Sequence, residues 1–454
     1  MPGPPVRRLP RRALLAAALA AATVPATAPT ATARAADAHG VDHHDWAFAR
    51  DFRAGRGEGT RVHGQRLVIG EPRGIITYTD PHRTIKAPSP WEYATWLSPR
   101  RELPGRGATE AVVSWNADTP RGTWLQLELR GRYSDGSDSP WVVMGRWAAA
   151  DTDIRRTSVD DQKDRAASVS TDTFALTDPA GRLRLTSYQV RVTLYRTPGS
   201  DRTPRLRRLS VMASGLPQRF TVPASVPGAG AGRELAVPAY SQETHAGQYP
   251  QYDDGGEAWC SPTSTQMVLA YWGRRPTRTQ LAWVDPAYAD PQVCHAARQT
   301  YDFQYEGCGN WPFNAAYAAT YPGMNGVVTR LRSLGDAETL VAAGIPVITS
   351  MSFLPGELSG ATYGTAGHIM VIAGFTAAGD VIVNDPAGAT NKDVRRVYGR
   401  RSFENIWLRT RRHDRKKKTV SGPGGIAYIY WPDEITAKQR EALATAAGIR
   451  AARE

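Results

Sequence analysis

The sequence predicts an all-β sandwich followed by an α+β domain, and three observations support this division. Residues 44–215 alternate apolar and polar side chains between turn signals and lack a helical stripe of useful length. Residues 216–233 are rich in Pro, Gly and Ala without periodicity, which is typical of a linker. Residues 234–432 mix helical segments with short apolar strands, as in an α+β domain.

The first 38 residues have the pattern of an export signal peptide. Four arginines precede a short apolar run, Ala13 to Val24, and small residues fit a signal-peptidase site at Ala33–Ala35 and Ala36–Ala38. The pair Arg11-Arg12 forms a partial twin-arginine pattern, so both the Sec and the twin-arginine routes remain open. We therefore expect a secreted, extracellular protein, either free or associated with the cell wall.

The net positive charge of the chain is modest and does not by itself identify a macromolecular partner. Removal of residues 1–38 takes away five arginines and one aspartate, which lowers the formal net charge from +13 to +9. This excess suits adhesion to an anionic surface such as a cell wall and does not call for nucleic acid. No later stretch approaches the roughly 18 apolar residues of a membrane span, so we expect no transmembrane segment.

In the β region, alternating segments predict strands at Thr123–Ser134, Ser187–Arg196 and Leu206–Ser214, and an Asp-Gly pair predicts a hairpin loop within Tyr133–Trp141. The region resembles, weakly, the jelly-roll sandwiches appended to secreted hydrolases. Exposed tryptophans could stack on sugar rings, although core packing is their commoner use. Binding of cell-wall glycan is therefore an open alternative for these seven tryptophans: Trp46, Trp91, Trp96, Trp115, Trp124, Trp141 and Trp147.

The second region supplies helix and strand candidates in alternation. Helices are predicted at Ser261–Trp272, Pro312–Thr320 and Ala337–Ala343, and the charged, Ala-rich residues 433–454 are expected to form a C-terminal helix. Strands are predicted at Pro346–Ser352, His368–Phe375, Val381–Asn384 and Ala427–Trp431. The basic run Arg409–Lys418 is most simply a solvated loop.

The three cysteines predict one pair and one free thiol, since three is an odd number for an exported chain. Cys294 and Cys308 share a polar stretch that looks like a loop, and a disulfide between them would contribute about 3 kcal/mol. Neither cysteine has the spacing of a zinc ligand and no HExxH motif occurs, so we expect no metal and no cofactor.

Cys260 is the expected free thiol, and it precedes a predicted helix. Pro262 suits the first helical turn and Gly273 the position just after the end. At a helix N-terminus the unpaired amides and the dipole favour a thiolate, which is the competent nucleophile. A buried, inert cysteine packed against the helix start is the alternative.

His368 is the best candidate base among nine histidines, because it opens an apolar strand after a glycine-bearing loop. A histidine satisfied in the core is the alternative. A four-residue hairpin loop would pair Phe375 with Asp380 and make His368 and Asp385 diagonal neighbours on one sheet face, roughly 7–8 Å apart at the backbone. Asp385 would then orient the imidazole. A three-residue loop without a bulge would place the two side chains on opposite faces.

Gln242 lies 18 residues before Cys260 and is a candidate oxyanion donor. By itself an isolated glutamine is a weak signal, and its interpretation depends on the cysteine, histidine and aspartate that follow it.

Four segments in order, VPAYSQ (237–242), AWCSPTSTQMVLAYWG (258–273), AGHIMVIAGF (366–375) and VNDPAG (383–388), resemble papain-like cysteine peptidases related to the bacteriocin double-glycine leader peptidases. The likeness covers residues 234–432 and is closer to the secreted, stand-alone bacterial members of this C39-like family. It implies a papain-like fold, in which the helix that begins with the cysteine packs on an antiparallel sheet carrying the histidine.

The resemblance also implies functional roles for four residues. Gln242 would form the oxyanion hole, Cys260 would be the nucleophile, His368 the general base and then acid, and Asp385 the orienting group. Because the chain has no membrane domain and no P-loop, leader cleavage coupled to export is not the expected role. The implied substrate is a peptide or protein.

Two alternatives remain open at this point. A cell-wall peptide amidase or transpeptidase would use the same residues, and a catalytically silent protein could attach to wall glycans through the β region.

Overall fold

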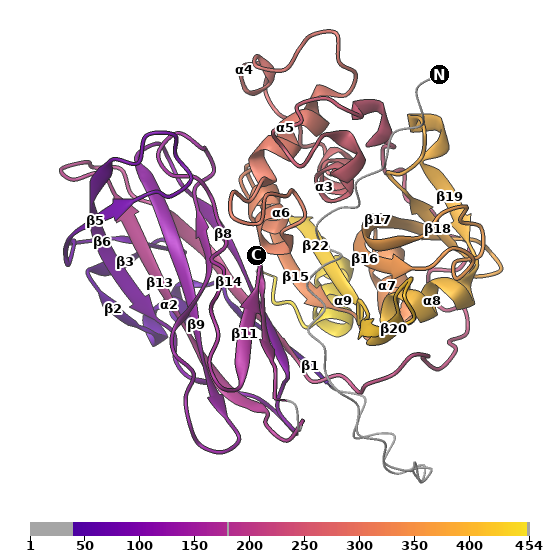
Figure 1. Ribbon diagram of the computed structural model, residues 1–454, viewed down its shortest axis with the longest axis horizontal. Coiled ribbons are helices and arrows are strands. Elements are labelled where there is room, and N and C mark those ends of the chain that lie inside the picture. The colour runs from indigo at the N-terminus through magenta and orange to yellow at the C-terminus, as the bar shows by residue number, and fades with distance from the viewer. Residues whose placement is uncertain (1–39, 179–180, 452–454) are drawn as a thin grey trace.

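The structure is a computed structural model that describes residues 40–178 and 181–451. The expected export signal lies outside the described residues. An N-terminal, sheet-rich part and a C-terminal part of mixed helices and strands pack against each other (Figure 1). Within the described ranges, no helix is both long enough and apolar enough to cross a membrane.

The N-terminal part contains two antiparallel seven-stranded sheets. The first has the order β11-β12-β8-β14-β4-β3, with β1 also paired to β14. Its strands are β1 (Val41–Trp46), β3 (Thr60–His63), β4 (Arg66–Ile69), β8 (Glu110–Asp118), β11 (Ala167–Ser170), β12 (Thr173–Leu176) and β14 (Arg205–Ser214). The second has the order β10-β9-β13-β6-β2, with β5 paired to β6 and β7 to β13. Its strands are β2 (Arg56–Glu58), β5 (Gly74–Thr79), β6 (Pro88–Leu97), β7 (Arg101–Glu102), β9 (Thr123–Tyr133), β10 (Val142–Trp147) and β13 (Leu185–Arg196), and one short helix, α2 (Ala49–Ala54), follows β1.

The tryptophans of this sandwich serve its core. Six of the seven are buried, which leaves only Trp141 half-exposed. Its ring is covered by the guanidinium groups of Arg130 at 4.9 Å and Arg191 at 4.7 Å. The tryptophans therefore give no reason to expect sugar binding on this part of the protein.

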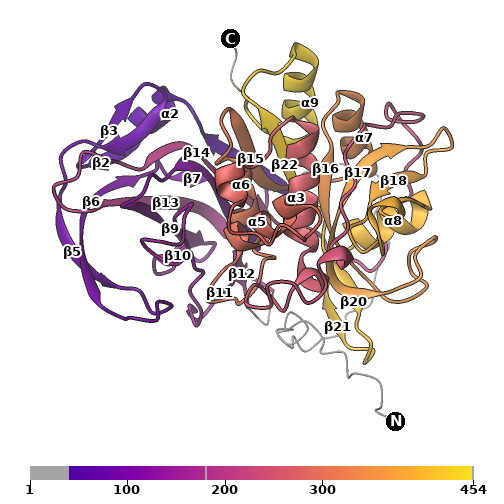
Figure 2. The ribbon, with the colours of Figure 1, turned by 90° about the horizontal axis from the view of Figure 1, so that it is seen from above.

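The C-terminal part is built on a six-stranded antiparallel sheet with the order β15-β22-β16-β17-β18-β19. The strands are β15 (Met324–Arg330), β16 (Val347–Phe353), β17 (Thr365–Phe375), β18 (Val381–Asn384), β19 (Arg395–Tyr398) and β22 (Ile426–Pro432). The helices are α3 (Cys260–Tyr271), α4 (Arg278–Leu281), α5 (Pro291–Thr300), α6 (Trp311–Ala318), α7 (Leu334–Ala342), α8 (Arg400–Leu408) and α9 (Ala437–Ala447). Three short 3₁₀ turns are η3 (Glu243–His245), η4 (Gly256–Ala258) and η5 (Asn391–Asp393). Helix α3 packs against β17, α6 against β15 and β22, and α8 against β16 (Figure 2).

Three segments differ from the sequence-based expectation. The first part of the supposed polar loop, residues 294–300, belongs to helix α5, because Pro291 starts a helix whose Val293, Ala296 and Ala297 are buried. The basic run, expected to be a loop, contains strand β20 (Arg411–His413) and the turn that connects it to its partner β21 (Thr419–Ser421).

The third segment is the expected linker, which lies along helix α8 and forms hydrogen bonds with it. The backbone N–H of Val222 donates to Asn405 and that of Ser225 donates to Glu404. Arg400 returns two bonds to the carbonyls of Ser225 and Val226. The segment is therefore a fixed connection and not a flexible spacer.

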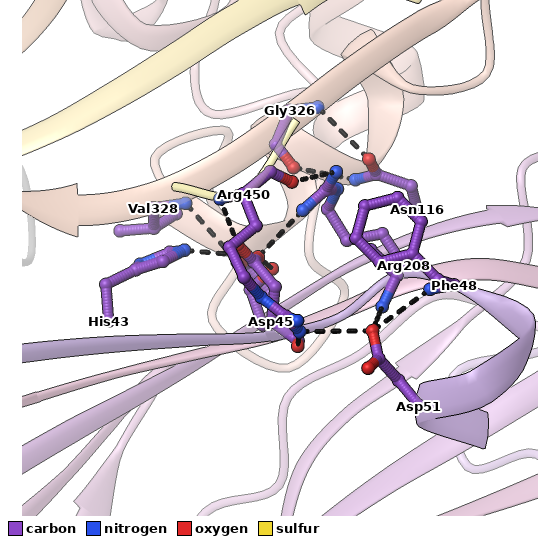
Figure 3. A network of polar contacts seen from close by, with 12 residues as sticks. His43, Asp45, Phe48, Asp51, Asn116, Arg208, Gly326, Val328 and Arg450 are labelled. Carbon is purple, nitrogen blue, oxygen red and sulfur yellow. Dashed lines mark hydrogen bonds and ion pairs between the residues drawn. The ribbon is translucent and has the colours of Figure 1, made fainter. Parts of the chain in front are cut away.

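Strand β15 is an edge of its sheet, and side chains of β8 satisfy its outward backbone groups. The Asn116 amide donates to the carbonyl of Gly326 at 2.6 Å and accepts from its N–H at 3.3 Å, while Ser114 accepts from the N–H of Val328 (Figure 3). Unpaired edge groups invite pairing with other chains. The sandwich thus covers the edge of the six-stranded sheet at β15, where no further strand pairs with the backbone.

The segment after helix α9 returns to the sandwich at the same boundary. The N–H of Arg450 donates to Asp45 at 3.0 Å, and its guanidinium group pairs with Asp51 at 3.0 Å (Figure 3). Arg208 also pairs with Asp45 at 2.9 Å and donates to the carbonyl of Arg450. The first strand and the last described residues are therefore held together by buried and half-buried charges.

Candidate active site

Helix α3 begins at Cys260 and is buried along almost its whole length. Two of its serines bond to the sheet beneath it: Ser261 contacts the Tyr428 hydroxyl at 3.1 Å, and Ser264 donates to the carbonyl of Ile369 at 3.2 Å. Because Ile369 follows His368, the bond from Ser264 brings the helix against the strand that carries this histidine. Cys260, at the start of the helix, is only half-buried, as is Tyr271 at its end.

His368 lies on β17, where it pairs with Met351 of β16 and is buried. The connection to β18 has five residues, since Phe375 pairs with Val381, and not the four that the sequence predicts. A bulge between Ile372 and Gly374 compensates, so that Val371 pairs with Asn384 as the four-residue loop would have required. The predicted loop is wrong by one residue, but the predicted relation of His368 to Asp385 survives.

Asp385 has four polar contacts, two on each carboxylate oxygen. Its Oδ1 lies 2.7 Å from His368 Nε2 and accepts the N–H of Ala387 at 3.0 Å. Its Oδ2 accepts the hydroxyls of Tyr363 at 2.7 Å and Tyr398 at 2.6 Å. The carboxylate is thereby held in one orientation toward the imidazole.

The electrostatics of this pair favour the ionised forms of both groups. Burial disfavours imidazolium, but the charge and hydrogen bond of Asp385, together with Cys260, outweigh burial and raise the pKa of His368 from 6.5 to about 10. Burial likewise opposes the carboxylate, yet His368 and the two tyrosine hydroxyls hold the pKa of Asp385 well below its usual value. At neutral pH the pair is therefore imidazolium and carboxylate.

Cys260 acts on the same imidazole from the other side. Its hydrogen bonding and charge are among the interactions that raise the pKa of His368, and its charge also raises the pKa of Tyr363 after the larger effect of burial. Since Nε2 faces Asp385, the other ring nitrogen, Nδ1, is the one left for the thiol. Cys260 and His368, 108 positions apart in the chain, are therefore close enough for the thiol to influence the imidazole.

Gln242 is buried close to these groups, but both of its amide hydrogens have acceptors. Its Nε2 donates to the carbonyl of Glu257 at 2.7 Å and to Glu243 at 3.2 Å, and its backbone N–H donates to Pro386, next to Asp385. The Oε1 atom is buried and has no hydrogen-bond partner. The structure therefore places Gln242 between the cysteine and aspartate segments, with an amide that is not free for a ligand.

The predicted disulfide between Cys294 and Cys308 is wrong, because all three cysteines are free thiols. Cys294 points from α5 toward His245 Nδ1 at 3.5 Å, whereas the Cys308 thiol donates to the carbonyl of Ala297 at 3.4 Å. Burial raises the pKa of Cys294 to about 12 and that of Cys308 well above its usual value. Both sulfurs behave as apolar core atoms with separate hydrogen-bond partners.

Tyr363 and Tyr398 are the functional candidates that the sequence analysis missed. Tyr363 lies in the loop before β17 and sits edge-on to the His368 ring at 5.8 Å. Tyr398 ends β19, a strand that was not predicted. No local pattern marks either residue; an aromatic next to a predicted site loop is the only signal the chain offers. Among the residues that the structure describes, no cluster of three or more His, Cys, Asp or Glu could hold a metal ion.

Comparisons with known proteins give family matches for both parts of the chain. Residues 42–214 match the family described as Peptidase C39 N-terminal domain, and residues 234–414 match the Peptidase C39 like family. A crystal structure of a candidate C39-like peptidase from Bacillus anthracis is 17% identical, with a TM-score of 0.26, and the match covers 45% of this chain and 98% of that one.

A carbohydrate-binding module of the β-sandwich superfamily is also similar, at 12% identity and a TM-score of 0.14, over 37% of this chain and 55% of that one. No curated protein matches the chain. Residues 234–414 thus match the C39-like peptidase family, and the region before them matches the N-terminal domain named for that family.

Proposed function

We propose that the protein is a secreted cysteine peptidase that hydrolyses peptide bonds through Cys260, His368 and Asp385. The observation that carries this proposal is the meeting of three groups: a half-buried thiol at a helix start, an imidazole that it influences, and a carboxylate 2.7 Å from the far side of that imidazole. The export pattern of the first 38 residues supports action outside the cell.

The imidazolium form of His368 suits the first chemical step. A cationic neighbour and a helix N-terminus both favour a thiolate. The thiolate sulfur of Cys260 bonds to the carbonyl carbon while the π electrons move to the oxygen. Collapse of this adduct breaks the C–N bond, and His368 gives its proton to the leaving amine.

The resulting thioester is then hydrolysed. His368, now neutral, takes a proton from water as the water oxygen attacks the thioester carbon, and the thiolate leaves to restore the starting pair. Asp385 keeps Nε2 protonated, so that Nδ1 faces the sulfur in both steps. His368 can therefore act as acid in the first step and as base in the second without a change in the orientation of its ring.

Two donors support the oxyanion in this proposal. The backbone N–H of Cys260 has no acceptor among the described residues and lies at the start of α3. Gln242 would be the second donor once the contact of its Nε2 with Glu243 is released, while the shorter bond to the carbonyl of Glu257 holds the side chain in place.

Labelling by a thiol-directed peptidase probe, combined with peptide-library cleavage, tests the proposal on the full chain. Wild type and Cys294→Ala, which alters a buried thiol outside the site, should both label and cleave. Cys260→Ala should do neither. Cleavage that persists in Cys260→Ala, or a wild-type protein that never labels, would refute the peptidase and would favour a silent binding protein.

A further inference from the structure

A groove of about 640 Å³ lies at the boundary between the sandwich and the C39-like domain. Arg83, Arg121 and Arg155 line it from the sandwich, and Tyr252, Trp283 and Arg298 line it from the C39-like domain. Neither part alone forms this surface. The groove is therefore a product of the association of the two domains.

The groove is strongly basic. Four arginines line it against one aspartate, Asp151, which leaves a net charge of +3. Asp151 is shared by Arg155 at 3.1 Å and Arg298 at 3.2 Å. Within the described ranges no carboxylate lies within ion-pair distance of Arg83 or Arg121, and Arg83 donates only to the backbone carbonyl of Asp153.

A further positive charge lies beside the groove. Arg156 is fully buried next to Asp151, and its guanidinium group donates to carbonyl oxygens, including that of Arg298 at 2.8 Å, and to the side chain of Gln299. Carbonyls satisfy its donors without cancelling its charge. A concave surface with an excess of one charge raises the local concentration of ligands of opposite charge.

Aromatic rings give the groove an apolar component. The guanidinium group of Arg298 lies 4.9 Å over the Trp283 ring, and Tyr252 meets Trp283 edge to face at 6.2 Å. The edge of the Arg298 guanidinium group is bonded to Asp151, so the groups that remain open to a further carboxylate are those of Arg83 and Arg121. The combination of these two guanidinium groups with ring faces suits side chains with a carboxylate on a short apolar stem.

One wall of the groove belongs to the segment that leads to Cys260. The indole N–H of Trp259 donates to the carbonyl of Tyr252 at 2.6 Å, and Trp259 is the residue before the thiol. Gln251 and Tyr252 lie between Gln242 and Cys260 in the chain. A ligand in the groove would therefore contact the same segment that positions the candidate nucleophile.

We propose that this interdomain groove binds glutamate or aspartate side chains of the peptide substrate, and that the N-terminal domain thereby takes part in substrate selection. This inference rests on the proposed peptidase function and names its substrate class as acidic peptides. Salt bridges from Arg83 and Arg121 hold the substrate carboxylates, while Trp283 and Tyr252 pack against the stems.

The test uses the full chain with Cys260→Ala, so that binding is measured without turnover. Fluorescence anisotropy compares a fluorescein-labelled decapeptide containing three glutamates with its glutamine counterpart and with labelled inorganic polyphosphate. The glutamate peptide should bind at least about tenfold more tightly than the glutamine peptide at low salt, and the difference should shrink as salt is raised.

Variants assign the binding to the groove. Arg83→Gln combined with Arg121→Gln should abolish the preference for glutamate, since both side chains are exposed and their loss leaves the core intact. Arg106→Gln combined with Arg182→Gln removes two exposed arginines of the sandwich outside the groove and should leave the preference unchanged.

Equal binding of the two peptides, retention of the preference in the groove variant, or binding of polyphosphate alone would overturn the proposal. None of these results bears on Cys260, since probe labelling of the wild-type thiol tests the peptidase function separately. If the thiol labels and peptides are cleaved without acidic preference, the peptidase stands and the groove assignment fails.

Discussion

Replacement of Asp385 by asparagine separates the charge of this residue from its shape. Asparagine keeps an oxygen that can accept from Ala387 or from the hydroxyls of Tyr363 and Tyr398, so the loop should hold its conformation. The negative charge beside His368 is lost. Burial, which lowers the pKa of His368, then becomes the leading influence on the imidazole.

The magnitude follows from the pKa of His368. A fall from about 10 to 6.5 or below removes about 5 kcal/mol of preference for imidazolium, at 1.36 kcal/mol for each pKa unit. At pH 7.5 the imidazolium fraction then falls from nearly all molecules to at most about one tenth. We expect the rate of Cys260 alkylation, which depends on the thiolate–imidazolium pair, to fall about tenfold or more.

The assay is the rate of iodoacetamide labelling of Cys260 from pH 5 to 10, with Asp201→Asn, an exposed carboxylate of the sandwich, as the matched control. Free energies of unfolding provide a second measurement. The raised pKa of His368 stabilises the folded state fully below about pH 6.5, and this contribution is lost as the pH rises through about 10. Stability should therefore fall across this window in wild type and much less in Asp385→Asn.

A labelling profile in Asp385→Asn that matches wild type across the whole pH range would refute this reasoning. It would mean that the charge of Asp385 does not control the protonation of His368. Loss of labelling in Asp201→Asn would instead point to a general effect of charge removal.

Three further predictions concern the surroundings of the site. Tyr363→Phe removes one of two hydroxyl donors to Asp385, a bond worth about 1.5–3 kcal/mol, so kcat/KM should fall about tenfold or more, and the acid limb of the pH–rate profile should move to higher pH; an unchanged profile would contradict a positioning role. Asn116→Ala leaves two backbone groups of Gly326 without partners and should lower the free energy of unfolding by about 2–4 kcal/mol in urea titrations, whereas a loss below 0.5 kcal/mol would show that water replaces the amide. A thiol reagent should modify one cysteine, Cys260, in the native protein and three after denaturation, and reducing agent should leave Tm unchanged. A Tm that falls when reducing agent is added would instead support a disulfide between Cys294 and Cys308.

Short-range patterns in the chain were sufficient to find the candidate site. Cys260 is recognisable because proline and glycine mark the start and end of its helix, and His368 because a polar residue opens an apolar strand. Strand alternation then restricts which residues can share a face with His368, which singles out Asp385. These features depend on residues within a few positions of one another, and they can therefore be predicted from the sequence without knowledge of the tertiary structure.

The tertiary structure decided everything that depends on contacts between distant segments. The bulge in β17 preserves the relation of His368 to Asp385 although the hairpin loop is longer than predicted, and alternation alone cannot count a bulge. The sequence indicated the C39-like family through its motifs, but the two tyrosines on Asp385 and the separate partners of Cys294 and Cys308 follow from packing. Likewise, the basic groove is formed by surfaces of two domains. The sequence of one domain does not show which residues of the other domain lie beside it.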